Sequence, residues 1–184
     1  MPIVFDVNIW AMRVVQRRPI DERELNSATA FIDFVGSLED PTTAGDEHRG
    51  SEHVTASAIV VSDAGDKVAL HLHKRLGMWL QPGGHIEPGE SVEDAALREA
   101  HEEIGVPVRH HRPDGVFVHV DVHPGPKGHT HHDLRLLVRA PEVTPDPAEG
   151  ESREVRWFSW DEAIGIADEG LVGALRAVRA LLDS

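Results

Sequence analysis

The chain has 184 residues, a formal net charge of −14 and no cysteine. This length suits one domain with an extension, and a domain of that size buries a core without disulfide support. The lack of cysteine excludes disulfides, zinc–thiolate sites and thiol nucleophiles, and the acidic charge argues against nucleic acid as the main partner. No apolar run reaches membrane-spanning length and no signal-peptide pattern opens the sequence, so we expect a cytoplasmic protein with no membrane partner.

Residues 1–50 are predicted to form an N-terminal helical extension and linker, ahead of a catalytic domain at 51–184. Apolar residues recur at helical spacing and predict one amphipathic helix at about 21–38: Leu25, Ala28, Phe31, Ile32, Val35 and Leu38. The turn-rich segment 41–50 is typical of a linker. Three roles are open to the extension: packing against the sheet, which we favour, a homodimer contact, or shaping a substrate pocket.

The rest of the chain alternates between strand and helix signals. β-branched and alternating apolar residues predict strands at about 54–61, 67–74, 106–111, 115–123, 131–139 and 154–158. Helices are expected at about 92–104, 160–168 and 171–182. This order predicts an α/β fold in which helices flank a mixed β-sheet.

A spaced motif, G-x5-E-x7-R-E-x-x-E-E-x-G, spans the first of these helices. Its fixed residues are Gly84, Glu90, Arg98, Glu99, Glu102, Glu103 and Gly105. Ser91 and Asp94 form a capping-box pattern at the start of the helix, and Gly105 is a typical residue just past its end. At about 100° per residue, the last three glutamates fall within one arc of the helix.

Like charges at i,i+3 and i,i+4 destabilise an isolated helix by a few tenths of a kcal/mol per pair. A divalent cation with oxygen ligands offsets that repulsion, and Mg²⁺ binds through a few carboxylates together with waters and phosphate oxygens. Two glycines, Gly83 and Gly84, precede the helix and let the backbone pass close to a metal or phosphate. The alternative is a solvated acidic face, which the whole motif disfavours.

The motif resembles the signature of the Nudix hydrolases, the MutT-like pyrophosphohydrolases, closely over residues 79–106 and more weakly over 52–184. The resemblance implies a Nudix-type α/β/α sandwich. It also implies a set of metal ligands: the carbonyl of Gly83 and the side chains of Glu99, Glu102 and Glu103. Arg98 and Glu90 resemble the pair that orients the family's site, since a guanidinium forms a fixed fork with a carboxylate.

The predicted activity is that of a Mg²⁺-dependent pyrophosphohydrolase, in which Mn²⁺ can substitute. Its substrate is expected to be a nucleoside diphosphate derivative: a nucleoside triphosphate, a nucleotide sugar or ADP-ribose. The general base is left open between Glu99 on the helix and two loop residues, Glu151 and Glu154. The competing interpretation is a catalytically silent Nudix-fold module that binds nucleotides for regulation; the intact motif favours the enzyme.

A histidine-rich hairpin is predicted at 116–139. Val118, Val120 and Val122 alternate with polar residues on its first strand, as Leu134, Leu136 and Val138 do on the second. The opposite face of the second strand carries His129, His131, Asp133 and Arg135. Three interpretations remain for this face: a solvated surface, substrate contact through His131, Asp133 and Arg135, or a second kind of metal held by imidazoles.

Overall fold

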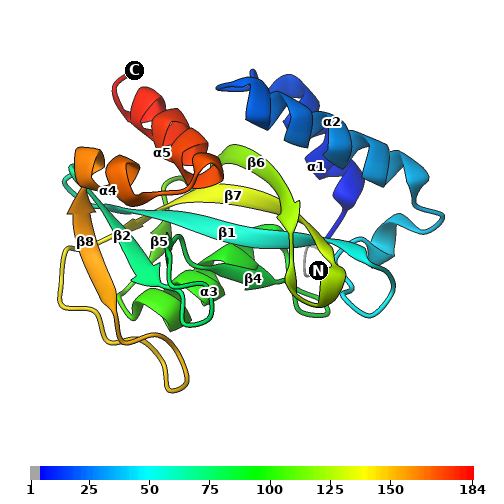
Figure 1. Cartoon of the computed structure of the whole chain (residues 1–184). Coiled ribbons are helices and arrows are strands. Elements are labelled where there is room, and N and C mark those ends of the chain that lie inside the picture. Colours follow the sequence, from blue (N-terminus) through cyan, green and yellow to red (C-terminus); the bar gives the residue numbers. More distant parts are fainter. Residues whose placement is uncertain (1–4) are drawn as a thin grey trace.

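A computed structural model describes residues 5–184 (Figure 1). In that part of the chain the helices are α1 (Val7–Gln16), α2 (Glu22–Ser37), α3 (Val92–Ile104), α4 (Trp160–Ile166) and α5 (Glu169–Leu182), with short 3₁₀ turns at Pro41–Thr43 (η1) and Pro126–Gly128 (η2). The strands are β1 (Glu52–Ser62), β2 (Lys67–Leu72), β3 (Trp79–Leu80), β4 (Gly83–His85), β5 (Arg109–His110), β6 (Phe117–Pro124), β7 (Thr130–Ala140) and β8 (Val155–Ser159).

These strands form one mixed sheet around two long central strands. β1 and β7 pair in parallel along their whole length, and the other pairings are antiparallel. The outer edge of β1 pairs with β4 near its start and with β2 near its end. The outer edge of β7 pairs with β6 and then with β5. The predicted mixed sheet is therefore confirmed.

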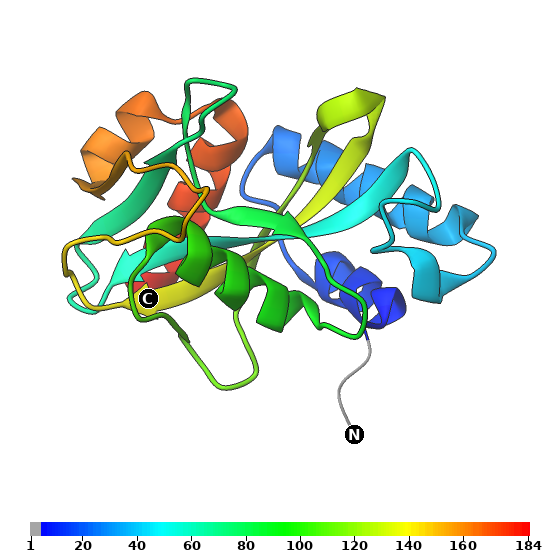
Figure 2. The same ribbon diagram turned by 90° about the horizontal axis from the view of Figure 1, so that it is seen from below.

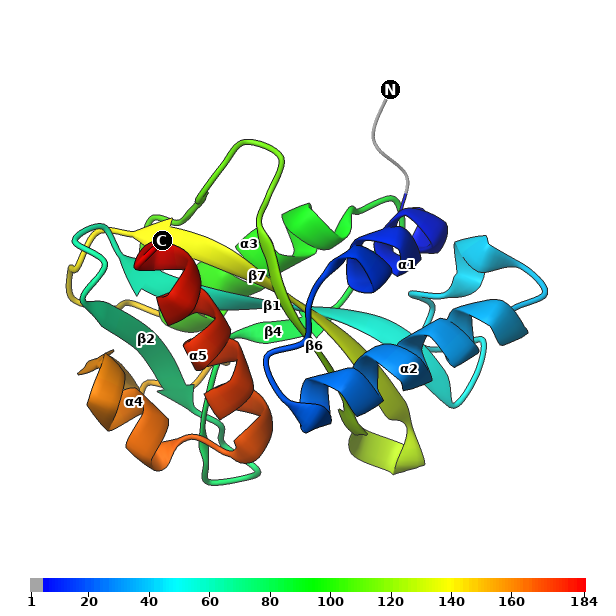
Figure 3. The same ribbon diagram turned by 90° about the horizontal axis from the view of Figure 1, so that it is seen from above.

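Helices cover both faces of this sheet. α3 lies across one face, as Figure 2 shows, while α4 and α5 lie on the other (Figures 1 and 3). Alternate residues of β1 serve the two cores: Ala56, Ala58 and Val60 pack in the core that contains α3, and Ile59 and Val61 pack in the core that contains α4 and α5. The predicted α/β/α sandwich is confirmed.

The N-terminal extension packs against this body. Residues of α1 and α2, among them Trp10, Phe31 and Phe34, belong to the same buried cluster as α3, and α2 lies along β6 (Figure 3). The favoured packing role is thus observed, while the division of the chain at residue 50 stays a prediction. Within residues 5–184 no helix combines the length and apolar character that crossing a membrane requires.

The predicted elements differ from the observed ones in a few places. α2 matches the helix expected at 21–38, but α1 was not predicted. The strand expected at 106–111 is reduced to β5 at 109–110, since Pro107 lacks the amide that a sheet hydrogen bond needs. The short strands β3 and β4 carry no alternation long enough to detect.

Candidate active site

Helix α3 begins and ends where the sequence predicts. The Ser91 hydroxyl accepts a hydrogen bond from the Asp94 amide at 3.1 Å, and Gly105 caps the other end with φ of 70°. The core face of the helix is made by Val92, Ala95, Ala96, Ala100 and Ile104. With that face buried, the adjacent edge carries the three motif carboxylates, Glu99, Glu102 and Glu103.

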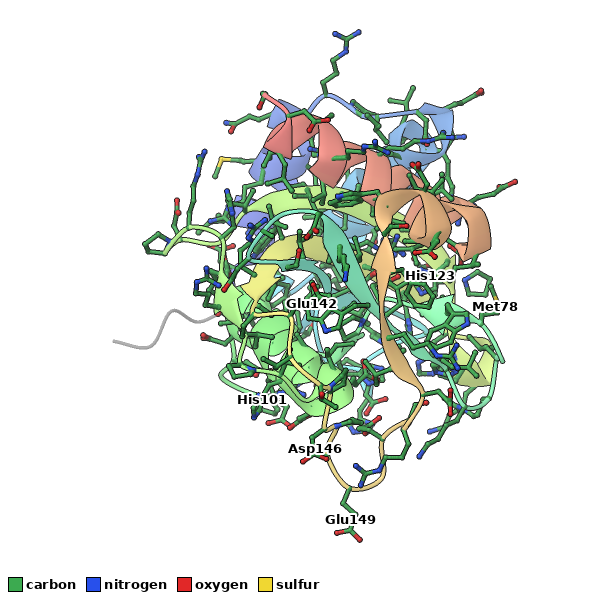
Figure 4. The ribbon with its side chains drawn as sticks, turned by 90° about the vertical axis from the view of Figure 1, so that its left-hand side faces the viewer. Met78, His101, His123, Glu142, Asp146 and Glu149 are labelled. Atoms are coloured by element: carbon green, nitrogen blue, oxygen red, sulfur yellow. The ribbon has the colours of Figure 1, made fainter. Side chains whose placement is uncertain are left out.

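The loop between β7 and β8 lies against the C-terminal end of α3. The Ala148 amide donates to the Glu102 carbonyl at 2.8 Å, and the Asp146 amide donates to the Gly105 carbonyl at 3.1 Å. A Cβ atom at Gly105 would lie 2.0 Å from the Asp146 carbonyl carbon, so glycine is required for this approach as well as for the left-handed turn. Figure 4 shows Asp146 and Glu149 on this loop, with Glu149 directed away from the protein.

Strand β4 brings its two glycines against the carboxylates of α3. The Gly83 amide donates to Oε2 of Glu103 at 2.8 Å. A Cβ atom at Gly84 would lie 2.3 Å from Oε1 of Glu99. The absence of a side chain at Gly84 therefore lets the Glu99 carboxylate lie directly over the strand backbone, whereas a Cβ atom at Gly83 would lie 2.1 Å from the Ser57 hydroxyl of β1.

Arg98 and Glu90 form the predicted fork. Nε and one terminal nitrogen of Arg98 donate to the two carboxylate oxygens of Glu90, each at 3.0 Å. The same guanidinium donates to the His85 carbonyl at 2.9 Å and to Glu99 at 2.7 Å. Arg98 therefore ties the loop before the helix, the end of β4 and one motif carboxylate together.

The surroundings of the carboxylate cluster favour the protonated form of two of its members, Glu103 and Glu99. Burial raises the pKa of Glu103 to about 8, against the effect of the Gly83 amide, and the nearby Glu99, Glu151 and Glu102 raise it further. Burial is also the main cause that raises the pKa of Glu99. A bound cation would reverse both effects by favouring the ionised forms.

Only one of the two loop candidates for the general base approaches this cluster. Glu154 is half exposed and pairs with Arg156 at 3.0 Å on the surface. The charge of Glu151, in contrast, acts on both Glu99 and Glu103. The structure thus brings Glu151 to the motif and leaves Glu154 outside it.

The donor set fits a hard divalent cation. Glu99, Glu102 and Glu103 supply oxygens, and the β4 backbone lies beside them, which is the chemistry that Mg²⁺ prefers. One residue beside the carboxylates was not predicted from the sequence. Nδ1 of His71, on β2, lies 3.7 Å from Oε1 of Glu103. Burial lowers the pKa of His71 to about 4, so this imidazole is neutral. No spacing in the sequence links it to α3.

A cleft of about 750 Å³ opens beside the motif. Gly84, Arg98 and Glu99 line one side, and the loop after β4 lines another. The remaining wall comes from the extension, at positions 42 and 45–48. The extension therefore shapes a cleft next to the carboxylates, in addition to packing on the core.

Asp133 and Arg135 of the hairpin lie in the interior, outside that cleft. Asp133 accepts hydrogen bonds from Thr55 at 3.1 Å, Ser57 at 2.7 Å and Arg135 at 2.8 Å. Arg135 also donates to Asp121 at 3.2 Å. Asp133 is 1% exposed and Arg135 is 3% exposed. The solvated-surface interpretation is therefore wrong for these two residues.

This buried network extends to both neighbouring helices. Arg135 donates to the Gly170 carbonyl in α5 at 2.8 Å, and Arg23 of α2 donates to Asp121 at 3.0 Å. Although burial acts to raise it, hydrogen bonds from His123 and Arg23 and the charge of Arg135 hold the pKa of Asp121 well below its usual value. Substrate contact by Asp133 and Arg135 stays a prediction, which their enclosure disfavours. His131, on the same strand, lies in a separate cluster with His53 and His85.

Fold and site together define an α/β/α hydrolase scaffold in which a glycine-containing strand and a carboxylate-rich helix form the reactive edge. The chain belongs to the Nudix hydrolase family: the family model described as the NUDIX domain matches residues 51–180. The motif residues, Gly83 and Glu151 all lie inside that range, whereas the cleft wall at positions 42 and 45–48 lies before it.

Curated relatives agree with this assignment. The chain is 33% identical over 144 residues to the NAD-capped RNA hydrolase NudC of Stutzerimonas stutzeri, covering 70% of this chain and 48% of that protein. It is 34% identical over 113 residues to the human NAD-capped RNA hydrolase NUDT12, covering 60% of this chain and 23% of that protein. The chain thus spans less than half the length of these relatives.

Solved structures show the same fold. A NUDIX-family hydrolase from Clostridium perfringens superposes with a TM-score of 0.60 at 31% identity, covering 70% of this chain and 97% of that one. An Ap4A hydrolase from C. elegans superposes with a TM-score of 0.60 at 24% identity, covering 71% and 97%. The second likeness concerns the fold alone.

Proposed function

We propose that this protein is a Mg²⁺-dependent pyrophosphohydrolase that cleaves a diphosphate linkage in a nucleoside diphosphate derivative. The observation that carries the proposal is the contact of Glu99 and Glu103 with the β4 backbone, with Arg98 holding both sides. The hydrolase names of the relatives support the same reaction class.

Glu99, Glu102 and Glu103, with the carbonyl of Gly83, would hold the cation. Mg²⁺, when bound, neutralises phosphate charge and lowers the pKa of water. Arg98, on α3, holds β4 in place by donating a hydrogen bond to the His85 carbonyl. The chain's own groups thus position a diphosphate in the cleft and accept the proton of the attacking water. A new phosphorus–oxygen bond forms as the bridging bond breaks.

Glu151 is the general base that we favour, because it is the loop carboxylate that acts on the cluster. Glu151→Gln should lower kcat by about 10²- to 10⁴-fold, the usual contribution of general-base catalysis. Glu154→Gln is the matched control on the same loop, and its kcat should change by less than about threefold, since its surface ion pair contributes little. Steady-state kinetics at saturating Mg²⁺ measures both. An unchanged kcat for Glu151→Gln would return the role to Glu99.

The candidate substrates are compounds that contain a diphosphate linkage. Nucleoside triphosphates, nucleotide sugars and ADP-ribose all contain the required linkage. NAD and NAD-capped RNA join them because two relatives are named for that cap. The net charge of −14 favours a free nucleotide over an RNA chain.

A screen of these compounds tests the proposal. At least one should be hydrolysed with Mg²⁺ or Mn²⁺, with product phosphates separated by chromatography, and turnover should vanish in excess chelator and return when the cation is restored. Full turnover in excess chelator contradicts the metal requirement. Tight nucleotide binding without turnover of any compound would favour the regulatory module instead.

A further inference from the structure

Three histidines from three adjacent strands meet at the end of the sheet nearest the β6–β7 turn (Figure 1). His53 of β1 stands opposite His131 of β7 in the parallel register, and His85 ends β4 on the other side of β1. The ring centroids are 4.9 Å apart for His53 and His131, 5.0 Å for His53 and His85, and 5.5 Å for His85 and His131. One potential ligand atom from each residue lies within 4.8 Å of the other two.

Three ring nitrogens in this cluster are buried without a hydrogen-bond partner among residues 5–184. His53 is 0% exposed and neither of its ring nitrogens has a hydrogen-bond partner; Nε2 of His131 is also buried without one. A buried polar group without a partner destabilises the fold, and native proteins rarely contain one. Burial, with a smaller effect from neighbouring imidazoles, lowers the pKa of His53 and of His131 to about 4. Both rings are therefore neutral near pH 7, which is the form that binds a metal.

We propose that His53, His85 and His131 form a binding site for a transition-metal cation of the Zn²⁺ type, separate from the carboxylate site of α3. Imidazole nitrogens suit Zn²⁺, which in catalytic sites takes three protein ligands and keeps a fourth position open. Zn–N bonds of about 2.0 Å place tetrahedral ligand nitrogens about 3.3 Å apart. The present separations therefore close by about 1.5 Å at most, which rotation of the imidazoles supplies. Mg²⁺ is a poor fit because it requires oxygen ligands.

Three groups border this set of ligands: Glu47, His123, and His129, whose ring centroid lies 5.3 Å from that of His53. Oε2 of Glu47 lies 3.5 Å from Nε2 of His85, where a carboxylate can orient a ligating imidazole. His123 packs against His131 at 5.5 Å, but its Nδ1 is already bonded to Asp121 at 3.0 Å. The buried network thus occupies one ring nitrogen of His123.

An ion at this site would be bonded to β4, the strand that also contacts the carboxylates of α3. The carbonyl of His85 accepts the hydrogen bond from Arg98, and His85 and Glu47 both line the cleft. The cation would therefore link β1, β4 and β7. Of these strands, β4 carries Gly83 and Gly84. The expected effect of the cation is a more stable fold, because a ligand that binds only the folded state raises the melting temperature.

Zinc titration of the full chain tests the site. The protein is stripped with chelator, supplied with excess Mg²⁺ to occupy the carboxylates, titrated with ZnCl₂ and passed through a desalting column before elemental analysis. One Zn²⁺ per chain should remain bound, with a raised Tm. His85→Asn and His131→Asn should each weaken binding by more than the 10-fold that loss of an outer partner typically causes. His48→Asn, a histidine whose side chain is 86% exposed in the same cleft, should bind as the parent does.

Two further measurements separate the sites and guard against misfolding. Glu103→Gln should retain its Zn²⁺, since that carboxylate belongs to the other site. Zinc-edge X-ray absorption of the unmodified protein should show imidazole scattering from three histidines, and this result does not depend on any variant. The proposal is overturned if no Zn²⁺ survives the Mg²⁺ competition, if the histidine variants bind normally, or if the ligands prove to be oxygens alone.

Discussion

Glu103→Gln should lower kcat by at least about 10²-fold, the scale of losing an electrostatic stabiliser of the transition state. The amide oxygen can still accept the hydrogen bond from Gly83, so the local backbone is preserved and the change removes charge alone. Glu102→Gln should reduce kcat on the same scale. The free energy of unfolding of the metal-free protein should be maintained in both variants, and raised for Glu103→Gln above about pH 8, where Glu103 is ionised and its repulsion with the other motif carboxylates is relieved.

Glu149→Gln is the control for these variants. This glutamate is exposed and points away from the protein on the loop beside α3 (Figure 4). Glu93, although on the same helix, is unsuitable because it pairs with Arg13 of α1 at 2.8 Å. Steady-state kinetics over a range of Mg²⁺ concentrations measures kcat and the apparent metal affinity together. Equal, small effects at positions 102, 103 and 149 would mean that the α3 carboxylates do not hold the metal.

The parts of the site that the sequence predicted depend on local geometry. The Ser91 cap, the Gly105 turn and the helical period together place the motif carboxylates on one edge of α3, and none of these needs a distant partner. The fork between Arg98 and Glu90 spans only eight residues and was predicted from the family pattern. Short-range rules were sufficient for these contacts.

The parts that the sequence left open, such as the choice between Glu151 and Glu154, or missed, such as His71, depend on distant segments. The position of Glu151 is set by hydrogen bonds from its loop to the end of α3, at Glu102 and Gly105. No sequence pattern near Glu151 predicts these hydrogen bonds. His71 reaches Glu103 only because β2 lies beside β1 in the sheet. Its neighbours in the sequence carry no sign of that contact.

Alternation predicted which hairpin residues share a face, but not what covers that face. Asp133 and Arg135 do share one, and their burial results from α5 and α2, which belong to opposite ends of the chain. Helix α1 was missed for a related reason. Its signal is short: the Asp6 cap and three buried residues, Val7, Trp10 and Val14. The β-branched residues among them have a weak helix propensity, and packing on the sheet outweighs it.

Arg135→Met should destabilise the protein by about 3–5 kcal/mol, the cost of removing one partner from a buried ion pair. The guanidinium donates to Asp133, Asp121 and the Gly170 carbonyl, so its loss leaves two carboxylates in the interior with less compensation. Unfolding in urea measures the change. The matched control is Arg156→Met, an arginine whose side chain is 62% exposed, which should alter stability by no more than about 1 kcal/mol.

Kinetics of the same variant separate the structural role of Arg135 from substrate contact. Measured well below the melting temperature, kcat/KM of Arg135→Met should stay within about threefold of the parent, because its side chain lies outside the cleft. Adding Asp133→Asn should recover part of the lost stability, since the second change removes a carboxylate that the first leaves unpaired. A large rise in KM with unaltered stability would instead place Arg135 in contact with the substrate. Strict additivity of the two substitutions would mean that the ion pair at 2.8 Å contributes no coupling.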